Sequence, residues 1–314
     1  MITSQTNRTF IESEQYSSFI LTNMHDGLLP ENFYRNVGDF GSGETLHIKT
    51  IGEAQIQEVS EDTPITYTPI ETGEVQLRIT EYVGDGWYIT DKVREDGAQM
   101  DALQAQRAKE ATRAIQEHFE TQALKTLNEG QTDADPNLVN SFAHRVASAE
   151  TNNVVKVDHF IDMKIAFDKA EVPYAGRVAF VDPVVEATLN GLFQGNYAVD
   201  SNAEMQGILE GGFGREHKFV MNLFGWDLMT SNRLDKGDFS DGTTAVTGAV
   251  ANVFMCIADD QCKSLMTAWR RQPSVEGDRN KDMQRDEYVQ TARWGMGIQR
   301  TDTLGVLITS ATNY

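Results

Sequence analysis

The sequence contains few cysteines and prolines and no long apolar run. Two cysteines, Cys256 and Cys262, are too few for a disulfide framework, and their spacing matches no common zinc or redox motif, so we expect packing residues. No stretch approaches the roughly 20 consecutive apolar residues of a membrane span. Met1–Tyr34 lacks the charged-then-apolar layout of a secretory signal. With seven prolines, 25 glycines and no solenoid-length repeat, the chain is not a tandem array. We therefore expect a soluble product made in the cytoplasm.

Basic residues are also scarce relative to acidic ones. Lys and Arg number 27 against 47 Asp and Glu, a formal net charge of −20. Tight non-specific binding to phosphate backbones needs a basic face, so any contact with nucleic acid is expected to be weak or local. The 40% hydrophobic and 24% charged residues are ordinary for globular proteins. A length of 314 residues suits two domains or one elaborate α+β unit.

The first part of the chain divides into an arm and a hairpin. Residues 1–43 mix polar residues with scattered apolar anchors and show no sustained period, which indicates an arm that needs another surface to lie against. Residues 44–82 alternate apolar and polar side chains in two limbs, which predicts a long hairpin with an acidic, proline-marked tip. Its stripe of Val75, Leu77 and Ile79 needs cover, either from the same subunit or from a neighbouring one.

The strongest helical signal lies in residues 91–128. No Gly or Pro interrupts residues 98–129, and apolar residues recur every three or four positions, at Ala108, Ala111, Ile115, Phe119, Ala123 and Leu127. About 30 residues at 1.5 Å each make a helix of ~45 Å. This length predicts a strut across the whole molecule.

The remainder interleaves helices and strands. Helices are predicted over residues 138–149, 157–170 and 184–192, the last with Asp182 and Pro183 as its cap and first position. Strands are predicted over residues 177–181, 219–230, 245–258, 266–275, 286–299 and 304–309. Residues 235–244 are expected to be a turn-rich insertion and residues 276–282 a charged turn. The order indicates a mixed α+β fold.

Three groups of residues invite a ligand hypothesis. Gly207, Gly211, Gly212 and Gly214 fit neither dinucleotide nor Walker spacing, so a flexible loop is the expectation. His159 and Asp162 lie three apart on a predicted helix, but two ligands are too few for a metal site, and solvation at the surface is expected. The last group comprises Asp235, Asp238, Asp241 and Gly242. It resembles an acidic cation loop only in part, because Ca²⁺ loops place oxygens at every second residue and end with Glu.

Aromatic and arginine residues near the end of the sequence are the remaining candidates. Trp269, Arg270 and Arg271, with Arg293 and Trp294, could stack on bases, but the acidic balance favours interface packing or ion pairs within the chain. The six histidines are dispersed, and no nucleophile elbow or His-Glu-x-x-His helix occurs. We therefore assign no catalytic, cofactor-binding or metal residue and no cofactor.

Taken in order, these features resemble the major capsid protein of tailed bacteriophages, a fold also seen in encapsulins. The resemblance covers essentially the whole chain. Its most telling stretches are Val83–Lys92 before the long helix, Gly207–Arg215 followed by the strand to Leu234, and the returning strands of Asp286–Asp302.

The resemblance implies a fold with an arm, an extended β-hairpin loop, a peripheral domain built on a long spine helix, and an axial α+β domain. The corresponding ranges are arm 1–43, extended loop 44–90, peripheral domain 91–150, axial domain 151–262, C-terminal strands of the peripheral domain 263–302, and a final strand and tail 303–314. Some family members join subunits through a loop lysine and a peripheral asparagine. Lys49 lies on the hairpin here, with no assignable partner or catalytic acid.

The implied function is structural. Family members assemble as hexamers and pentamers into an icosahedral shell around double-stranded DNA, with a scaffolding protein during assembly and a portal at one vertex. The resemblance places the protein in the virion, with only weak DNA contact and no membrane. The lack of a long charged N-terminal helical extension favours a separate scaffold. The alternatives are an encapsulin-type compartment shell and a two-domain soluble enzyme built around His159 and Asp162.

Overall fold

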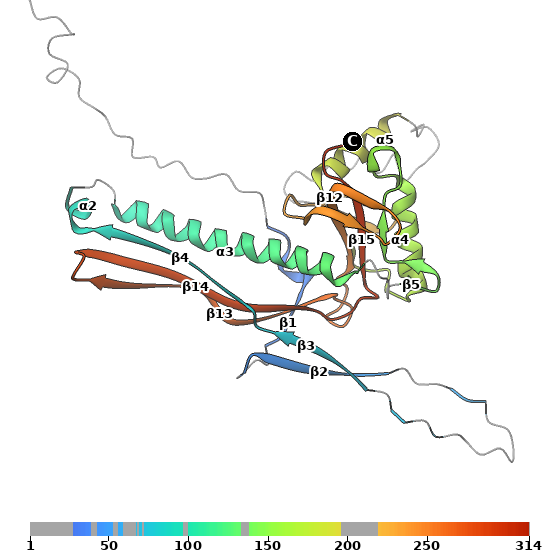
Figure 1. Cartoon of the computed structure of the whole chain (residues 1–314), viewed down its shortest axis with the longest axis horizontal. Coiled ribbons are helices and arrows are strands. Elements are labelled where there is room, and N and C mark those ends of the chain that lie inside the picture. Colours follow the sequence, from blue (N-terminus) through green and yellow to red (C-terminus); the bar gives the residue numbers. More distant parts are fainter. Residues whose placement is uncertain are drawn as a thin grey trace, which may run out of the picture.

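The structure is a computed structural model, and its described residues fall into two sheet-based units and a projecting hairpin (Figure 1). It describes residues 28–38, 43–52, 56–58, 67, 69–70, 72–96, 100–132, 138–195 and 219–313. One unit is elongated and carries the longest helix. The other is more compact and holds two of the other three α-helices.

The elements follow one another in an interleaved α+β order. The helices are η1 Glu31–Phe33, α2 Asp91–Asp96, α3 Met100–Gly130, η2 Thr151–Asn153, α4 Val157–Lys169 and α5 Pro183–Gly195. The strands up to β8 are β1 Arg35–Asn36, β2 Thr45–Ile51, β3 Thr72–Arg78, β4 Glu81–Thr90, β5 Leu138–Val139, β6 Phe142–Ala143, β7 Arg145–Ala147 and β8 Arg177–Val181. The later strands are β9 Phe219–Leu223, β10 Trp226–Thr230, β11 Lys236–Ser240, β12 Ala245–Cys256, β13 Leu265–Asn280, β14 Arg285–Ile298 and β15 Leu304–Ser310.

The elongated unit is a four-stranded sheet covered by α3. Its order is β1-β13-β14-β4, with β13, β14 and β4 antiparallel and the short β1 parallel to β13. Ile115 and Phe119 of α3 pack against Ala292 and Trp294 of β14. The β13–β14 pair runs to a distant turn, so this sheet is a long ribbon (Figure 1).

Helix α3 also contacts the compact unit. Its last turns bury Ala123, Leu124 and Leu127 against residues of β8 and β12. At its C-terminal end, Arg145 of β7 donates hydrogen bonds to the carbonyl oxygens of Asn128 and Gln131, at 3.2 and 2.6 Å. Cationic side chains stabilise a helix C-terminus in this position. The predicted strut is confirmed, and it connects both sheets.

The compact unit is built on a seven-stranded mixed sheet. The order is β7-β15-β12-β8-β10-β9, with β11 pairing β12. Helices α4 and α5 cover one face through Phe160, Phe167 and Leu189. The last turns of α3 cover part of the opposite face. Strand β15 lies inside the sheet, between β7 and β12, although it is the last of the described strands in the sequence.

Most predicted elements are confirmed, including the hairpin. Strands β2 and β3 pair antiparallel over seven residue pairs. Helices α4 and α5 and strands β8, β12, β14 and β15 occur where residue patterns indicate them. Asp182 Oδ2 accepts the Val184 N–H at 3.1 Å, which confirms the predicted cap of α5. Of the predicted arm, residues 1–27 and 39–42 lie outside the described residues, whereas η1 and β1 supply its short local structure.

The predicted helix over residues 138–149 is wrong. This range forms the three short strands β5, β6 and β7. Asn140 and Ser141 have φ values of 51° and 70°, left-handed conformations that end an α-helix. The apolar spacing resembles a helical period only because a two-residue turn separates two short strands.

Three strand boundaries also differ from the prediction. The strand expected over residues 219–230 is a hairpin, divided at Phe224 and Gly225 by φ values of 51° and 87°. The insertion expected over residues 235–244 contains strand β11, which pairs with β12. The charged turn expected over residues 276–282 is mostly strand, because Glu276–Asn280 pair with Arg285–Val289.

Within the described residues, no helix is long and apolar enough to cross a membrane.

Candidate assembly surfaces

The root of the hairpin, Leu77–Ile79, packs within its own chain. Leu77 is fully buried and Ile79 nearly so, and both pack against Met266 and Ala268 of β13. Ile79 N–H also donates to Glu44 O at 2.9 Å, which closes the base of the hairpin. Of the two expected sources of cover for the stripe, the same subunit supplies it at the root.

The root also lies directly on the backbone of β14. A Cβ atom placed on Gly295 would lie 2.1 Å from the Arg78 carbonyl oxygen and 2.8 Å from the Ile79 Cα. No side chain fits in that space, so only glycine permits this approach. Gly295 therefore helps to set the position and direction of the hairpin.

The hairpin end, which comprises Ile51, Ile56, Tyr67 and Ile70, is exposed. These side chains are 79%, 98%, 93% and 80% exposed, respectively. Exposed large apolar side chains gathered on one projecting segment are typical of a binding surface. The described part of this chain does not cover them.

Polar side chains hold the two strands of the hairpin in register. His47 of β2 and Glu74 of β3 form a short hydrogen-bonded contact, and Gln76 Nε2 donates to the same carboxylate at 3.0 Å. The hydrogen bond from His47 is the main reason that the pKa of Glu74 lies below its ordinary value. Lys49 is exposed and opposes Glu74 across the ladder. The structure gives Lys49 no catalytic acid or cross-linking partner among the described residues.

A charged network lies at the turn end of the β13–β14 ribbon. The Arg279 guanidinium donates two hydrogen bonds to the Asp91 carboxylate, at 2.9 and 2.8 Å, and a third to Asp286 at 3.1 Å. Arg94 pairs with Asp286 from the other side. The bond from Arg279 holds the pKa of Asp91 below its usual range. Helix α2 is thereby held to the end of the ribbon by ion pairs that remain largely exposed and salt-sensitive.

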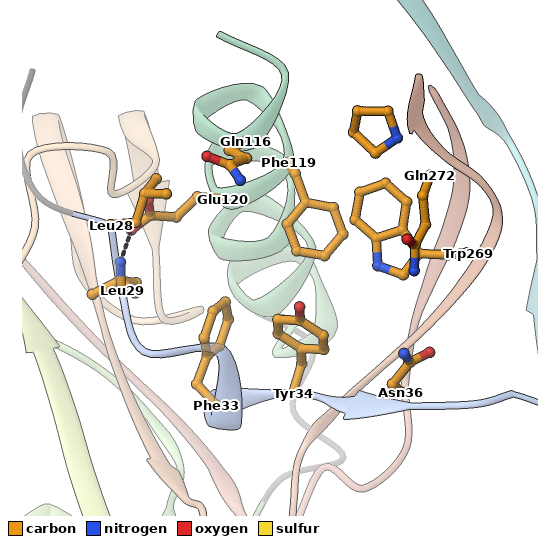
Figure 2. Close-up of a pocket in the computed structure, with 11 residues that line it drawn as sticks. Leu28, Leu29, Phe33, Tyr34, Asn36, Gln116, Phe119, Glu120, Trp269 and Gln272 are labelled. Carbon is orange, nitrogen blue, oxygen red and sulfur yellow. Dashed lines mark hydrogen bonds between the residues drawn. The ribbon is translucent and has the colours of Figure 1, made fainter. Parts of the chain in front are cut away.

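A groove of about 320 Å³ lies between the first described segment, α3 and β13 (Figure 2). Aromatic rings of Phe33, Tyr34, Phe119 and Trp269 gather around it. Phe119 and Trp269 stack with their centroids 4.8 Å apart. At one side, Glu120 Oε1 accepts the Leu29 N–H at 3.1 Å, which fixes the start of this segment against α3.

Glu120 also belongs to an ion-pair cluster between α3 and the compact unit. Arg233, in the turn after β10, donates to Glu120 Oε2 at 3.0 Å and to Glu117 Oε1 at 2.9 Å. The Glu120 side chain is 4% exposed and that of Arg233 is 12% exposed. Buried ion pairs fix relative position more than they add stability. This cluster joins the N-terminal segment, α3 and the compact unit at one place.

The two residues predicted as a possible ligand pair, His159 and Asp162, do not form a site. His159 is the third residue of α4, and its Nδ1 accepts the Lys156 N–H at 3.1 Å as part of a helix cap. Burial lowers the pKa of His159, so the ring is a neutral acceptor. Among the described residues, no group of three or more His, Cys, Asp or Glu side chains is arranged to hold a metal ion.

The aspartates of residues 235–242 bind separate parts of the protein. Asp235 accepts from Asn128 of α3 at 2.8 Å, and Asp238 accepts the Gly248 N–H at 2.9 Å. Asp241 accepts three backbone N–H groups, from Ala147, Thr243 and Thr244. Gly242 occupies a left-handed conformation at φ 87° in the same turn. These carboxylates position β11 and its turn and do not converge on a cation.

The aromatic and arginine group is used inside the chain, as expected. Trp294 is fully buried, and Trp269 lies 5.1 Å from it between centroids. Arg271 pairs with Glu276, and Arg293 lies 3.7 Å from Glu44. Cys256 and Cys262 both pack against the core beneath α4, also as expected. The predicted glycine loop, residues 207–214, lies outside the described residues.

Sequence reasoning missed the residues that position the hairpin and join the units. Gly295 and Gly297 alternate within a predicted strand, and glycine inside a strand is a signal for close backbone approach. That signal was available in the sequence. Arg233 and Glu120 are 113 residues apart and carry no comparable local signal.

Comparisons with known proteins agree with this arrangement. A family model described as phage capsid protein matches residues 72–309. No curated protein matches the chain. Among solved structures, the chain is similar to one from Mycobacterium phage Che8, with a TM-score of 0.66 and 15% identity over 97% of this chain and 98% of that chain.

Two further structures show the same likeness. One is the capsid structure of Cyanophage P-SCSP1u, with a TM-score of 0.68 and 16% identity over 97% of this chain and 94% of that chain. The other is the capsid of a native GTA particle, with a TM-score of 0.64 and 11% identity over 99% of this chain and all of that chain. At these identities the likeness shows the fold, and the predicted tailed-phage capsid fold is confirmed. Because the family model covers most of its length, the chain belongs to the phage capsid protein family: it is a structural component of the virion and not an enzyme.

Proposed function

We propose that this chain is the major coat subunit of a tailed phage and that it assembles into hexamers and pentamers of an icosahedral shell around double-stranded DNA. The observation that supports this most directly is the exposed hairpin end. Its four large apolar side chains project from a root that is fixed within the chain. In the assembled shell, a second subunit covers them.

The proposed contact is individually weak. Burying one isoleucine side chain contributes roughly 2 kcal/mol, before the cost of ordering the segment. Millimolar affinity corresponds to about 4 kcal/mol, so one hairpin end supplies a reversible contact. A shell made of many such contacts corrects errors during assembly and is stable once closed.

The proposed domain division follows the implied ranges. The arm is 1–43, the extended loop 44–90, the peripheral domain 91–150 with 263–302, the axial domain 151–262, and the last strand and tail 303–314. Four strands pair across these boundaries, because β1 and β4 lie in the sheet of the peripheral domain and β7 and β15 lie in the axial sheet. Only β2 and β3 then form the projecting part of the loop.

The proposal also includes the partners that the family resemblance implies, which are packaged DNA, a scaffolding protein and a portal. A formal net charge of −20 favours weak contact with packaged DNA, which then slides during filling and exit. A shell that must reach one size and admit DNA also needs a scaffolding protein and a portal at one vertex. The subunit is made in the host cytoplasm. The family match favours this coat protein over an encapsulin-type compartment.

The test is an assembly assay on the full-length protein, with and without its scaffolding protein. Replacing Ile51, Ile56 and Ile70 with Ser should leave the circular dichroism spectrum and melting temperature unchanged, because these side chains contact solvent. It should abolish particles in negative-stain images. Leu138→Ser is the matched control, since Leu138 is 54% exposed and lies away from the hairpin. Normal shells from the triple variant, or wild-type protein that stays monomeric under all conditions, would refute the proposal.

A further inference from the structure

The two cysteines lie together at the connection between the two sheets. Cys256 is the last residue of β12, in the seven-stranded sheet, and is fully buried. Cys262 belongs to the turn that leads from β12 to β13, in the four-stranded sheet. It packs against the same core cluster as Cys256. Burial is the main reason that the pKa of the Cys256 thiol is raised, and the neighbouring Cys262 raises it further.

The surroundings hold both side chains in this arrangement. The Cys256 Sγ lies 3.7 Å from the Ala175 carbonyl oxygen and 3.9 Å from that of Pro173. The Cys262 N–H donates to Asp259 O at 2.9 Å, which fixes the turn. Gln299 Nε2 donates to two further carbonyl oxygens of the turn, those of Asp260 and Gln261.

We propose that Cys256 and Cys262 form an intramolecular disulfide when the protein meets an oxidising medium. The two residues are the only cysteines of the sequence, so neither has a competing partner within the chain. A disulfide needs its sulfurs to approach to about 2.05 Å. Cys262 is the partner that moves, because it lies in a turn whereas Cys256 is fixed in a central strand.

The oxidant is a low-molecular-weight disulfide such as glutathione disulfide. Cys262 is partly exposed, so its thiolate attacks the external disulfide, forms a mixed disulfide and releases one thiolate. The Cys256 thiolate then attacks the Cys262 sulfur and releases the second thiolate. Both departing thiolates take up the two protons lost by the cysteines. The protein thiols are oxidised, and one external disulfide is reduced to two thiols.

Burial affects the two steps differently. Desolvation raises the pKa of the Cys256 thiol, so little thiolate is present at neutral pH. The second step is therefore the slower one, and it accelerates as pH rises. The location of the reaction, but not its chemistry, rests on the proposed function. The host cytoplasm keeps thiols reduced, and a released virion meets an oxidising medium.

The consequence is a covalent link across the connection between the sheets. The bond would close a short ring from the end of β12 through the turn that precedes β13. Loop closure restricts the unfolded chain, so the oxidised protein should melt at a higher temperature than the reduced protein.

The test uses purified full-length protein, reduced and then incubated with glutathione disulfide at pH 8 before acid quenching. Expected are the loss of both maleimide-reactive thiols in denaturant, an intact mass lower by two hydrogens, and one peptide linked between the two cysteines. Persistent free thiols, a lasting glutathione adduct on wild-type Cys262, or disulfide-linked dimers on a non-reducing gel would overturn the proposal.

Two variants test the order of the steps. Cys256→Ser should retain a glutathione adduct on Cys262, because no second thiol resolves it. Cys262→Ser should keep Cys256 unmodified, and rapid modification of Cys256 there would overturn the proposed order. If Cys256→Ser fails to fold, the wild-type mass remains decisive. The readouts need no shell, so failure of assembly and failure of this chemistry are separate results.

Discussion

The contact at Gly295 allows a quantitative test of how hairpin direction controls assembly. In Gly295→Ala, the new Cβ would begin 2.1 Å from the Arg78 carbonyl oxygen. Real Cβ contacts are essentially never below 3.0 Å, so the root must move by about 0.9 Å. The obstacle is backbone on both sides, so no side-chain rotation relieves it. Overpacking of this kind costs about 1–3 kcal/mol.

The displacement grows along the hairpin. Strand β3 has seven residues, which at roughly 3.4 Å each span about 24 Å. If the shift is absorbed as a tilt over roughly 7 Å of strand, the hairpin end moves by about 3 Å. A displacement of that size breaks the complementarity of a packed interface. We therefore expect a folded subunit that fails to form regular particles.

The matched control is Gly297→Ala, on the same strand two residues away. The nearest atoms to a Cβ there are Leu77 Cδ1 at 3.2 Å and Met266 Cε at 3.3 Å, both ends of flexible side chains. This variant should lose less than about 1 kcal/mol of unfolding free energy and should assemble. Urea denaturation measures the stabilities, and sedimentation with negative-stain imaging measures assembly. Equal stability and equal particle yield for the two variants would refute the reasoning.

Three further predictions concern the compact unit. Arg177→Met should lower the unfolding free energy by about 2–4 kcal/mol, because it removes a guanidinium that is 1% exposed and bound to Asp168 at 2.7 Å. Urea denaturation measures this change, and an unfolding free energy equal to that of the wild type within error would contradict the prediction. Burial lowers the pKa of His159 below 6.5, so protonation favours the unfolded chain, and the unfolding free energy of the wild type should fall between pH 7 and 5. His159→Gln should flatten this pH dependence, and an unchanged slope would contradict the prediction. Burial raises the pKa of Asp241, but its backbone N–H donors outweigh burial, so the pKa in the folded protein lies below 3.8. The ionised carboxylate therefore stabilises the folded protein above that pH, and this stabilisation is lost as the pH falls below it. Asp241→Asn should reduce the loss of melting temperature that the wild type shows in acid.

A local pattern of apolar and polar residues was sufficient to predict the helices and strands that have one. The apolar stripe of α3, the alternation of β2 and β3, and the proline at the start of α5 each determine one element without reference to the rest of the chain. The helix predicted over residues 138–149 was wrong because its periodicity was accidental and was interrupted by left-handed residues.

Pairing between distant segments was not predictable in this way. Arg35 of β1 lies beside Met266 of β13, and nothing in a two-residue strand specifies that partner. The same holds for the contacts of Glu120 with Leu29 and Arg233. Such contacts depend on the tertiary arrangement of whole units. The hairpin end was predicted to need cover, whereas its fixed root on Gly295 required the structure.

The interior position of β15 determines when a newly made subunit can complete its central sheet. Leu304–Ser310 is almost fully buried between β7 and β12, so the central sheet stays open until the ribosome has released these residues. Until then, the long edge of β12 is a template for pairing with other nascent chains. Completion of the sheet therefore waits for Leu304–Ser310, and a chain that lacks these residues should leave the β12 edge unpaired.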